Sequence, residues 1–75
     1  MKQQYPQINR IYAHYKGGTY EVLHLAKNTT DDTIMVIYQS REFGSHYARP
    51  LSEWWDVVID EYEEGSPYNQ RFYVL

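Results

Sequence analysis

The chain contains no cysteine, which excludes both disulfide bonds and thiolate metal sites. Its 75 residues lie near the lower size limit for a domain that folds without such links, so side-chain burial must supply the core. No run approaches the roughly 20 apolar residues of a membrane span, and residues 1–7 lack the apolar stretch of a signal peptide. A reducing compartment suits this composition, and we expect a cytoplasmic protein with no membrane association.

Positive charge is scarce in the second part of the chain. Residues 1–50 hold six Lys or Arg against four acids, a balance of +2, whereas residues 51–75 hold one Arg against six acids, a balance of −5. The net charge of −3 and its distribution provide no uniformly basic surface of the kind that binds nucleic acid. We interpret the acidic run at residues 60–64 as a solvated turn that favours solubility.

Aromatic side chains are abundant, with nine Tyr, two Trp and two Phe. Each buries on the order of 150–250 Å² when it enters a core, so a few can replace many aliphatic residues. The core of so short a chain does not need all of them. We therefore expect some aromatic rings to reach the surface, and this is the first indication of a binding function.

Turn residues divide the chain into short β segments. Residues 11–15 form a strand or an extended arm, and we expect strands at residues 19–27, 33–39, 46–49, 57–59 and 70–75, with a single helical turn at residues 51–56. Gly17 and Gly18 suit a hairpin turn because glycine accepts positive φ. These elements predict an all-β fold, a small SH3-like five-stranded barrel or roll, with an open α+β roll as the alternative. The domain is expected at residues 10–75, after a flexible lead-in at residues 1–9.

The strand at residues 19–27 alternates in a way that assigns its two faces. Tyr20, Val22, His24 and Ala26 share one face, and Glu21, Leu23, Leu25 and Lys27 share the other. Both sets contain apolar side chains, so the strand is expected to be covered for part of its length on each side.

Several segments resemble a known family. They are Tyr12-x-His14-x-Lys16-Gly17-x-x-Tyr20-x-Val22-Leu23-x-x-Ala26, Asn28-Thr29, Val36-Ile37-Tyr38, Tyr47-Ala48-Arg49-Pro50-Leu51 and Arg71-Phe72. In order and approximate spacing they resemble a small bacterial family known as a domain of unknown function, number 1653, over residues 12–75. The resemblance implies an SH3-like barrel and brings no catalytic residues. The chain departs from the family pattern at Tyr47 (usually Trp), Glu53-Trp54 (usually Met-Phe), Asn28 (usually His) and Gln70 (usually Pro).

Familiar catalytic and metal-binding patterns do not emerge. His14, His24 and His46 lack the close spacing of zinc ligands, and Ser45 beside His46 points to the opposite face of a strand. No helix follows Gly17-Gly18 to complete a phosphate loop. We therefore expect no enzyme activity, no metal and no cofactor.

The polar and aromatic members of the matching segments are the candidate ligand-binding residues: Tyr12, His14, Lys16, Tyr38, Tyr47, Arg49, Trp54 and Arg71. Arginine stacks on aromatic rings and grips carboxylate or phosphate with its planar fork. Trp54 is expected in the core and Trp55 partly exposed, because successive helical residues diverge by about 100°. We predict a non-catalytic module that binds a protein segment or a small anionic ligand, as a monomer or weak homodimer. A nucleic-acid-binding barrel and a structural homo-oligomer subunit are the alternatives.

Overall fold

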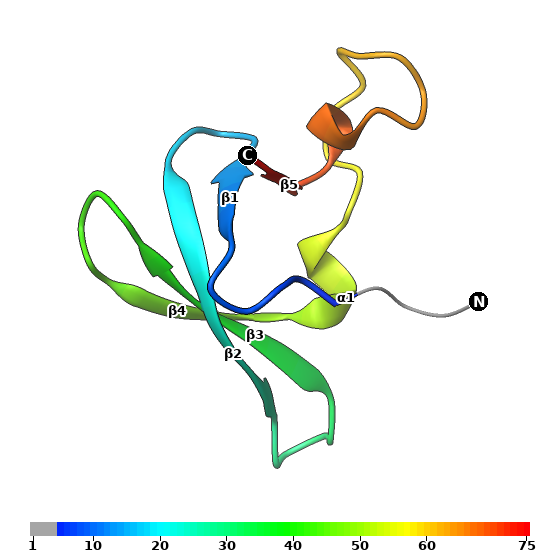
Figure 1. Cartoon of the computed structure of the whole chain (residues 1–75). Helices are drawn as coiled ribbons and strands as arrows, with labels where there is room; N and C mark the ends of the chain where they lie inside the picture. Colours follow the sequence, from blue (N-terminus) through cyan, green and yellow to red (C-terminus); the bar gives the residue numbers. More distant parts are fainter. Residues whose placement is uncertain (1–4) are drawn as a thin grey trace.

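The computed structural model describes residues 5–75 and is mainly β (Figure 1). The elements in chain order are β1 (Ile11–His14), β2 (Thr19–Lys27), β3 (Ile34–Ser40), β4 (His46–Pro50), α1 (Leu51–Trp54), the 3-10 turn η1 (Pro67–Asn69) and β5 (Phe72–Val74). The predicted mainly β class with one short helical turn is confirmed, and the strand at residues 19–27 has the predicted bounds.

The five strands form one antiparallel sheet in the order β4-β3-β2-β1-β5. The first four strands follow one another as a meander, and β5 returns to pair with β1. The sheet order pairs neither β4 nor β5 with a further strand, so the sheet is an open roll rather than a closed barrel.

The sheet nevertheless curves strongly on itself. In a flat sheet β3 and β5 would lie about 14 Å apart, since three strand spacings separate them. The rings of Tyr38 on β3 and Phe72 on β5 have centroids only 5.3 Å apart. Curvature therefore creates a concave face, on which side chains from distant strands meet.

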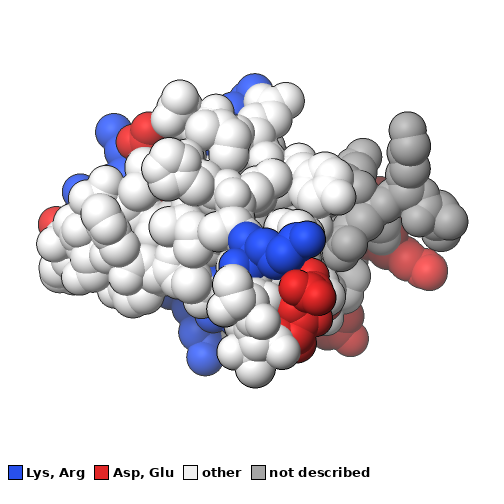
Figure 2. Space-filling view, turned by 90° about the horizontal axis from the view of Figure 1, so that it is seen from below, with Lys and Arg blue, Asp and Glu red and all other residues white. Residues whose placement is uncertain are grey.

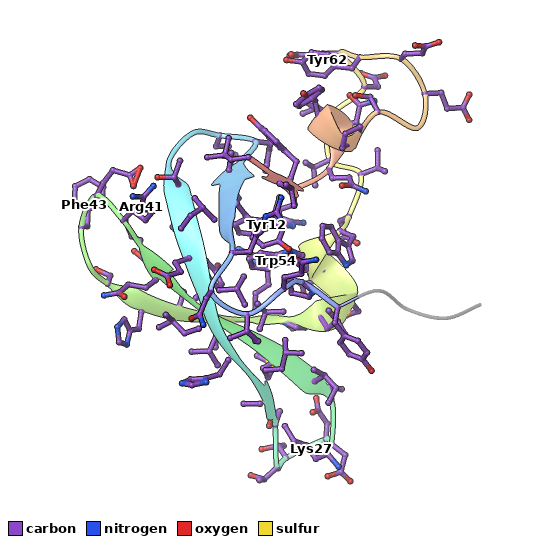
Figure 3. All side chains as sticks on the ribbon, in the orientation of Figure 1. Tyr12, Lys27, Arg41, Phe43, Trp54 and Tyr62 are labelled. Atoms are coloured by element: carbon purple, nitrogen blue, oxygen red, sulfur yellow. The ribbon has the colours of Figure 1, made fainter. Side chains whose placement is uncertain are left out.

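The core fills this concave face with a small set of large rings. Its buried members are Tyr12, Val22, Val36, Tyr38, Leu51, Trp54 and Phe72. Trp54 stacks on Phe72, with ring centroids 3.8 Å apart and planes 3° from parallel, so α1 covers the sheet from the β5 side. Trp54 is buried as predicted, and Trp55 is partly buried and packs against the core. Figure 3 shows Tyr12 and Trp54 both directed into this interior.

A β-bulge corrects the predicted faces of β2. The pairing of β2 with β3 shifts register between Val22 and His24. Such a bulge places an extra residue in one strand and reverses the alternation beyond it. As a result Val22 and Leu25, which strict alternation assigned to opposite faces, both pack against the core.

The expected strand at residues 57–59 is absent. Val57 makes one isolated bridge to Gln70, and Val58 and Ile59 direct their backbone N–H groups to the carbonyl of Asn69. The segment thus runs beside the lead-in to β5 without joining the sheet. Its β-branched composition predicted a strand, but its backbone pairs with the irregular segment around Asn69 rather than with a strand of the sheet.

Residues 59–70 form an irregular arm that projects from the sheet and carries Tyr62 near its tip (Figure 3). Asn69 is 4% exposed and fixes the arm with its side chain. Its Nδ2 donates to the carbonyls of Tyr62 and Glu63, both at 3.2 Å, and its Oδ1 accepts from the Tyr62 N–H at 3.1 Å. The acidic run expected as a solvated turn lies in this arm, with residues 60–64 exposed.

A lead-in was predicted at residues 1–9, and residues 1–4 of it lie outside the described part of the chain. From there on, the backbone is held against the domain. Pro6 is buried, the Gln7 N–H donates to the Tyr12 hydroxyl at 2.9 Å, and the Asn9 N–H donates to the Val22 carbonyl at 2.7 Å. Residues 6–9 thus cover part of the β1–β2 side of the roll.

Candidate ligand-binding site

A pocket of about 270 Å³ opens at one end of the roll, the end that carries the β1–β2 and β3–β4 turns. The register brings residues from all five strands to this end, because His14 pairs with Phe72 and Tyr38 with Tyr47. The residues that line the pocket are His14, Tyr20, Tyr38, Tyr47, Arg49 and Phe72.

Aromatic rings form the walls of the pocket. The Tyr20 ring lies at the centre, with centroids 5.4 Å from Tyr38, 6.2 Å from Tyr47 and 5.8 Å from Phe72. All three contacts are edge-on, the arrangement that aromatic quadrupoles favour. Burial raises the pKa of the Tyr20 hydroxyl, and the neighbouring Tyr47, Tyr38 and Glu42 add to this, so Tyr20 stays neutral and can donate a hydrogen bond.

Arg49 is the cationic member of the lining, and its guanidinium is only partly engaged. Its Nε donates to the Tyr38 hydroxyl at 3.5 Å, and its Nη1 donates to Glu53 Oε1 at 3.1 Å. A guanidinium has five N–H groups, so these two contacts leave donors that can point into the pocket. The side chain of Arg49 is 27% exposed, so a ligand can reach it.

His14 contributes a neutral imidazole at the rim. Its Nδ1 accepts the Lys16 N–H at 3.1 Å, which leaves Nε2 to carry the proton. Burial lowers the pKa of His14, and the positive charges of Arg49, Arg71 and Lys16 lower it further. These three cations act on one ring, so the positive charges around His14 disfavour its protonation although the whole chain is acidic.

A negative charge lies near the pocket, outside its lining. Glu42, in the β3–β4 turn, accepts hydrogen bonds from the N–H and hydroxyl of Thr19, at distances from 2.7 to 3.3 Å. Glu42 also helps to raise the pKa of Tyr20, so its charge acts within the pocket. An anion bound here is therefore favoured beside Arg49 and opposed beside Glu42.

The structure brings together four of the eight sequence-predicted residues in the pocket lining: His14, Tyr38, Tyr47 and Arg49. Two others, Tyr12 and Trp54, are at most 1% exposed and lie in the core beneath. Lys16 is exposed in the β1–β2 turn, with its ammonium 5.7 Å from the Tyr15 ring centroid. Arg71 is tied to the backbone of α1, since its Nε donates to the Glu53 carbonyl at 3.0 Å.

Sequence reasoning missed two lining residues, Tyr20 and Phe72. Tyr20 was placed on one face of the strand at residues 19–27 without a binding role, and Phe72 was matched only as the neighbour of Arg71. Residues that face each other across a hairpin turn share one end of a sheet, so the position of Tyr20 just after the Gly17-Gly18 turn was a usable signal. No comparable signal existed for Phe72, because only the β1–β5 pairing brings it to His14.

A second, larger concavity of about 540 Å³ lies in the arm, lined by Val57, Ile59, Asp60, Tyr62, Glu64, Gly65, Ser66, Asn69 and Gln70. Its charged members, Asp60 and Glu64, are both acidic, and its apolar residue Val57 is 73% exposed. The hollow is formed by the loop itself rather than by packed elements. We regard the smaller pocket as the stronger candidate because rings from five strands enclose it beside a cation.

Two further features are limited to the part of the chain that the structure describes. Within residues 5–75, no group of three or more His, Asp or Glu side chains is placed to hold a metal ion. No helix in that range is long and apolar enough to cross a membrane.

Fold and site together define a small, mainly β domain with an aromatic, partly cationic pocket at one end of an open roll. The chain belongs to the family described as protein of unknown function (DUF1653), whose model matches residues 10–73. The resemblance found in the sequence is thereby confirmed. A search of curated proteins found no match, and neither did a search of solved structures.

Proposed function

We propose that this chain is a non-catalytic binding module of the bacterial cytoplasm that recognises an anionic group carried on a flat or apolar body. The convergence of Tyr38, Tyr47, Arg49 and His14 on one pocket is the observation that carries the proposal. Aromatic walls favour the apolar body, and the free N–H groups of Arg49 favour the anion.

The lining supports binding rather than catalysis. Its titratable residues that the structure describes are His14, three tyrosines and Arg49. The Nδ1 of His14 already accepts a backbone N–H, and no Ser or Thr hydroxyl lies in the lining to pair with the imidazole. What the pocket offers is a set of hydrogen-bond donors around apolar walls.

The charge distribution favours a compact anion over a long nucleic-acid strand. On the face in Figure 2, blue basic and red acidic groups are scattered among uncharged side chains and form no continuous basic track. A nucleic-acid site needs such a track to follow the phosphate backbone. One anionic group beside Arg49 requires only the local positive potential.

Titration with benzoate and with benzamide tests the proposal, because the two probes share shape and differ in charge. We expect benzoate to shift the NMR signals of the six lining residues, and benzamide to bind at least about tenfold more weakly, since charge-assisted hydrogen bonds to Arg49 are lost. Arg49→Gln should weaken benzoate binding by a similar factor. Arg41→Gln, at an exposed site in the β3–β4 turn (Figure 3), is the matched control and should leave it unchanged. Equal binding of both probes, or shifts confined to residues 59–66, would refute the proposal.

A further inference from the structure

The strand beside the pocket, β4, is an edge of the sheet, and half of its backbone hydrogen-bonding groups face away from it. The Ser40 N–H donates to the Ser45 carbonyl, which sits directly opposite, at 2.9 Å. Bonded and non-bonded pairs alternate along an antiparallel ladder. The backbone groups of Tyr47 and Arg49 therefore pair with β3, and those of His46 and Ala48 point outward.

These outward groups are free to accept a partner. His46 and Ala48 are exposed, and no described residue outside the sheet makes a backbone hydrogen bond to either of them. Proteins often protect such edges with lysine, with inward-pointing charge or with a covering loop. On β4, Arg49 points inward and Pro50 occupies the last position, yet the N–H and carbonyl groups of His46 and Ala48 stay available.

The side chains of the same strand lead into the pocket. Tyr47 and Arg49 alternate with His46 and Ala48, and both line the pocket on the concave face. A strand added to the outer edge of β4 would place its own alternate side chains beside Tyr47, at a spacing of about 4.5–5.5 Å between facing Cβ atoms. One ligand can therefore pair with β4 through its main chain and place a side chain in the pocket.

We infer that the partner is an extended acidic segment of another protein, which pairs with β4 and delivers a carboxylate side chain to Arg49. This inference rests on the proposed function, since it uses the same pocket and specifies what carries the anion. Charge complementarity selects an acidic segment, because Arg49 lines the pocket from β4 itself and its side chain is 27% exposed. Strand addition would supply affinity through the backbone and specificity through alternate side chains.

The test uses a six-residue peptide with glutamate at every second position and valine between, titrated into the uniformly labelled protein. We expect the amide protons of His46 and Ala48 to exchange at least about tenfold more slowly with the peptide bound, since they gain partners. A peptide N-methylated at the pairing positions keeps every side chain but loses the strand-pairing donors. It should bind at least tenfold more weakly than the parent.

A protein variant gives the reciprocal control. Ala48→Pro removes an outward N–H at an edge position, where proline is tolerated, and should weaken the parent peptide without affecting benzoate. Equal affinity of the parent and N-methylated peptides, with no added protection at His46 and Ala48, would overturn strand addition. If benzoate still binds in that case, the pocket proposal stands. If neither benzoate nor the peptide binds, both proposals are overturned. If light scattering shows instead that the protein without peptide forms a dimer as its concentration rises, a second copy occupies the edge of β4.

Discussion

The pocket and the arm both contain tyrosines that contact one another but are built differently. In the pocket, Tyr20 contacts rings from β3, β4 and β5, and the lining runs from His14 near the start of the chain to Phe72 near its end. In the arm, Tyr62 and Tyr68 lie 5.5 Å apart on one loop, and Asn69 supplies the hydrogen bonds that hold that loop. Tyrosine enrichment alone therefore does not mark a site. Enclosure by distant strands and a nearby cation distinguish the pocket from the arm.

The two regions also differ in charge. The charges of three cations act on His14 at the pocket, whereas residues 60–64 of the arm contain four acids and no base. The sequence already contained this division as a balance of +2 in residues 1–50 and −5 in residues 51–75. Arg71, from the acidic part of the chain, is the exception, since its positive charge acts on His14.

The largest expected effect comes from a substitution in the core beneath the pocket. Trp54→Ala should lower the free energy of unfolding by about 3–5 kcal/mol, because it empties the position that stacks on Phe72. For a domain of this size, that loss approaches the whole stability. Tyr62→Ala in the arm, where the ring is 51% exposed, is the control and should cost less than about 1 kcal/mol. Urea unfolding followed by circular dichroism measures both, and comparable losses would mean that the arm is as structurally important as the core.

The next largest expected effect is a loss of stability confined to the arm. Asn69→Ala removes three hydrogen bonds from a buried position and leaves their backbone partners to find water, at a cost of about 1–3 kcal/mol. We expect faster amide exchange and faster proteolysis in residues 60–66, while the pocket signals keep their positions. Ser66→Ala, which removes one exposed hydrogen bond to the Tyr68 N–H, should have a smaller effect. Loss of the pocket signals in the Asn69 variant would show that the two regions unfold as one unit.

Sequence reasoning predicted the elements that local pattern determines. The β-branched run at residues 33–39 and the alternation at residues 19–27 became β3 and β2, and Pro50 marked the boundary between β4 and α1. The class of the fold followed from these segments. Closure did not, because whether β4 and β5 meet depends on curvature summed over five strands, which no local pattern records.

The errors came from features that only pairing reveals. A bulge has no sequence signal as strong as alternation, so the inward position of Leu25 could not be predicted from its place in β2. Val57 to Ile59 have strand-forming composition, yet their backbone pairs with the irregular segment around Asn69. In the pocket, Arg49, Tyr38 and Tyr47 were identified from motifs. Tyr20 was missed, and the ring of Phe72 arrives through the long-range return of β5.

A smaller effect tests the electrostatics of the pocket through pH. Burial and three nearby cations hold the pKa of His14 below its ordinary value, so the unfolded chain binds the proton more readily. Stability contributed by neutral His14 is therefore complete above about pH 6.5 and is lost as the pH falls below this value. We expect His14→Gln to reduce the loss of stability between pH 7 and pH 5. His24→Gln, an exposed site on β2, should retain the wild-type loss, and identical pH profiles for wild type and the His14 variant would contradict the assignment.

The smallest expected change in stability comes from two carboxylates, one within α1 and one just after it, and their effects on ligand binding should differ. Glu53 pairs with Arg49 at the pocket, and Asp56 pairs with Arg71 outside it, with both carboxylates about half exposed. Each pair should contribute at most about 1 kcal/mol, so Glu53→Gln and Asp56→Asn should unfold at nearly the wild-type urea concentration. Their effects on benzoate should differ. Glu53→Gln frees Arg49 and removes a repelling charge, which we expect to tighten benzoate binding roughly threefold, whereas Asp56→Asn should leave it unchanged. Weaker binding by the Glu53 variant would show instead that this carboxylate positions Arg49 for the ligand.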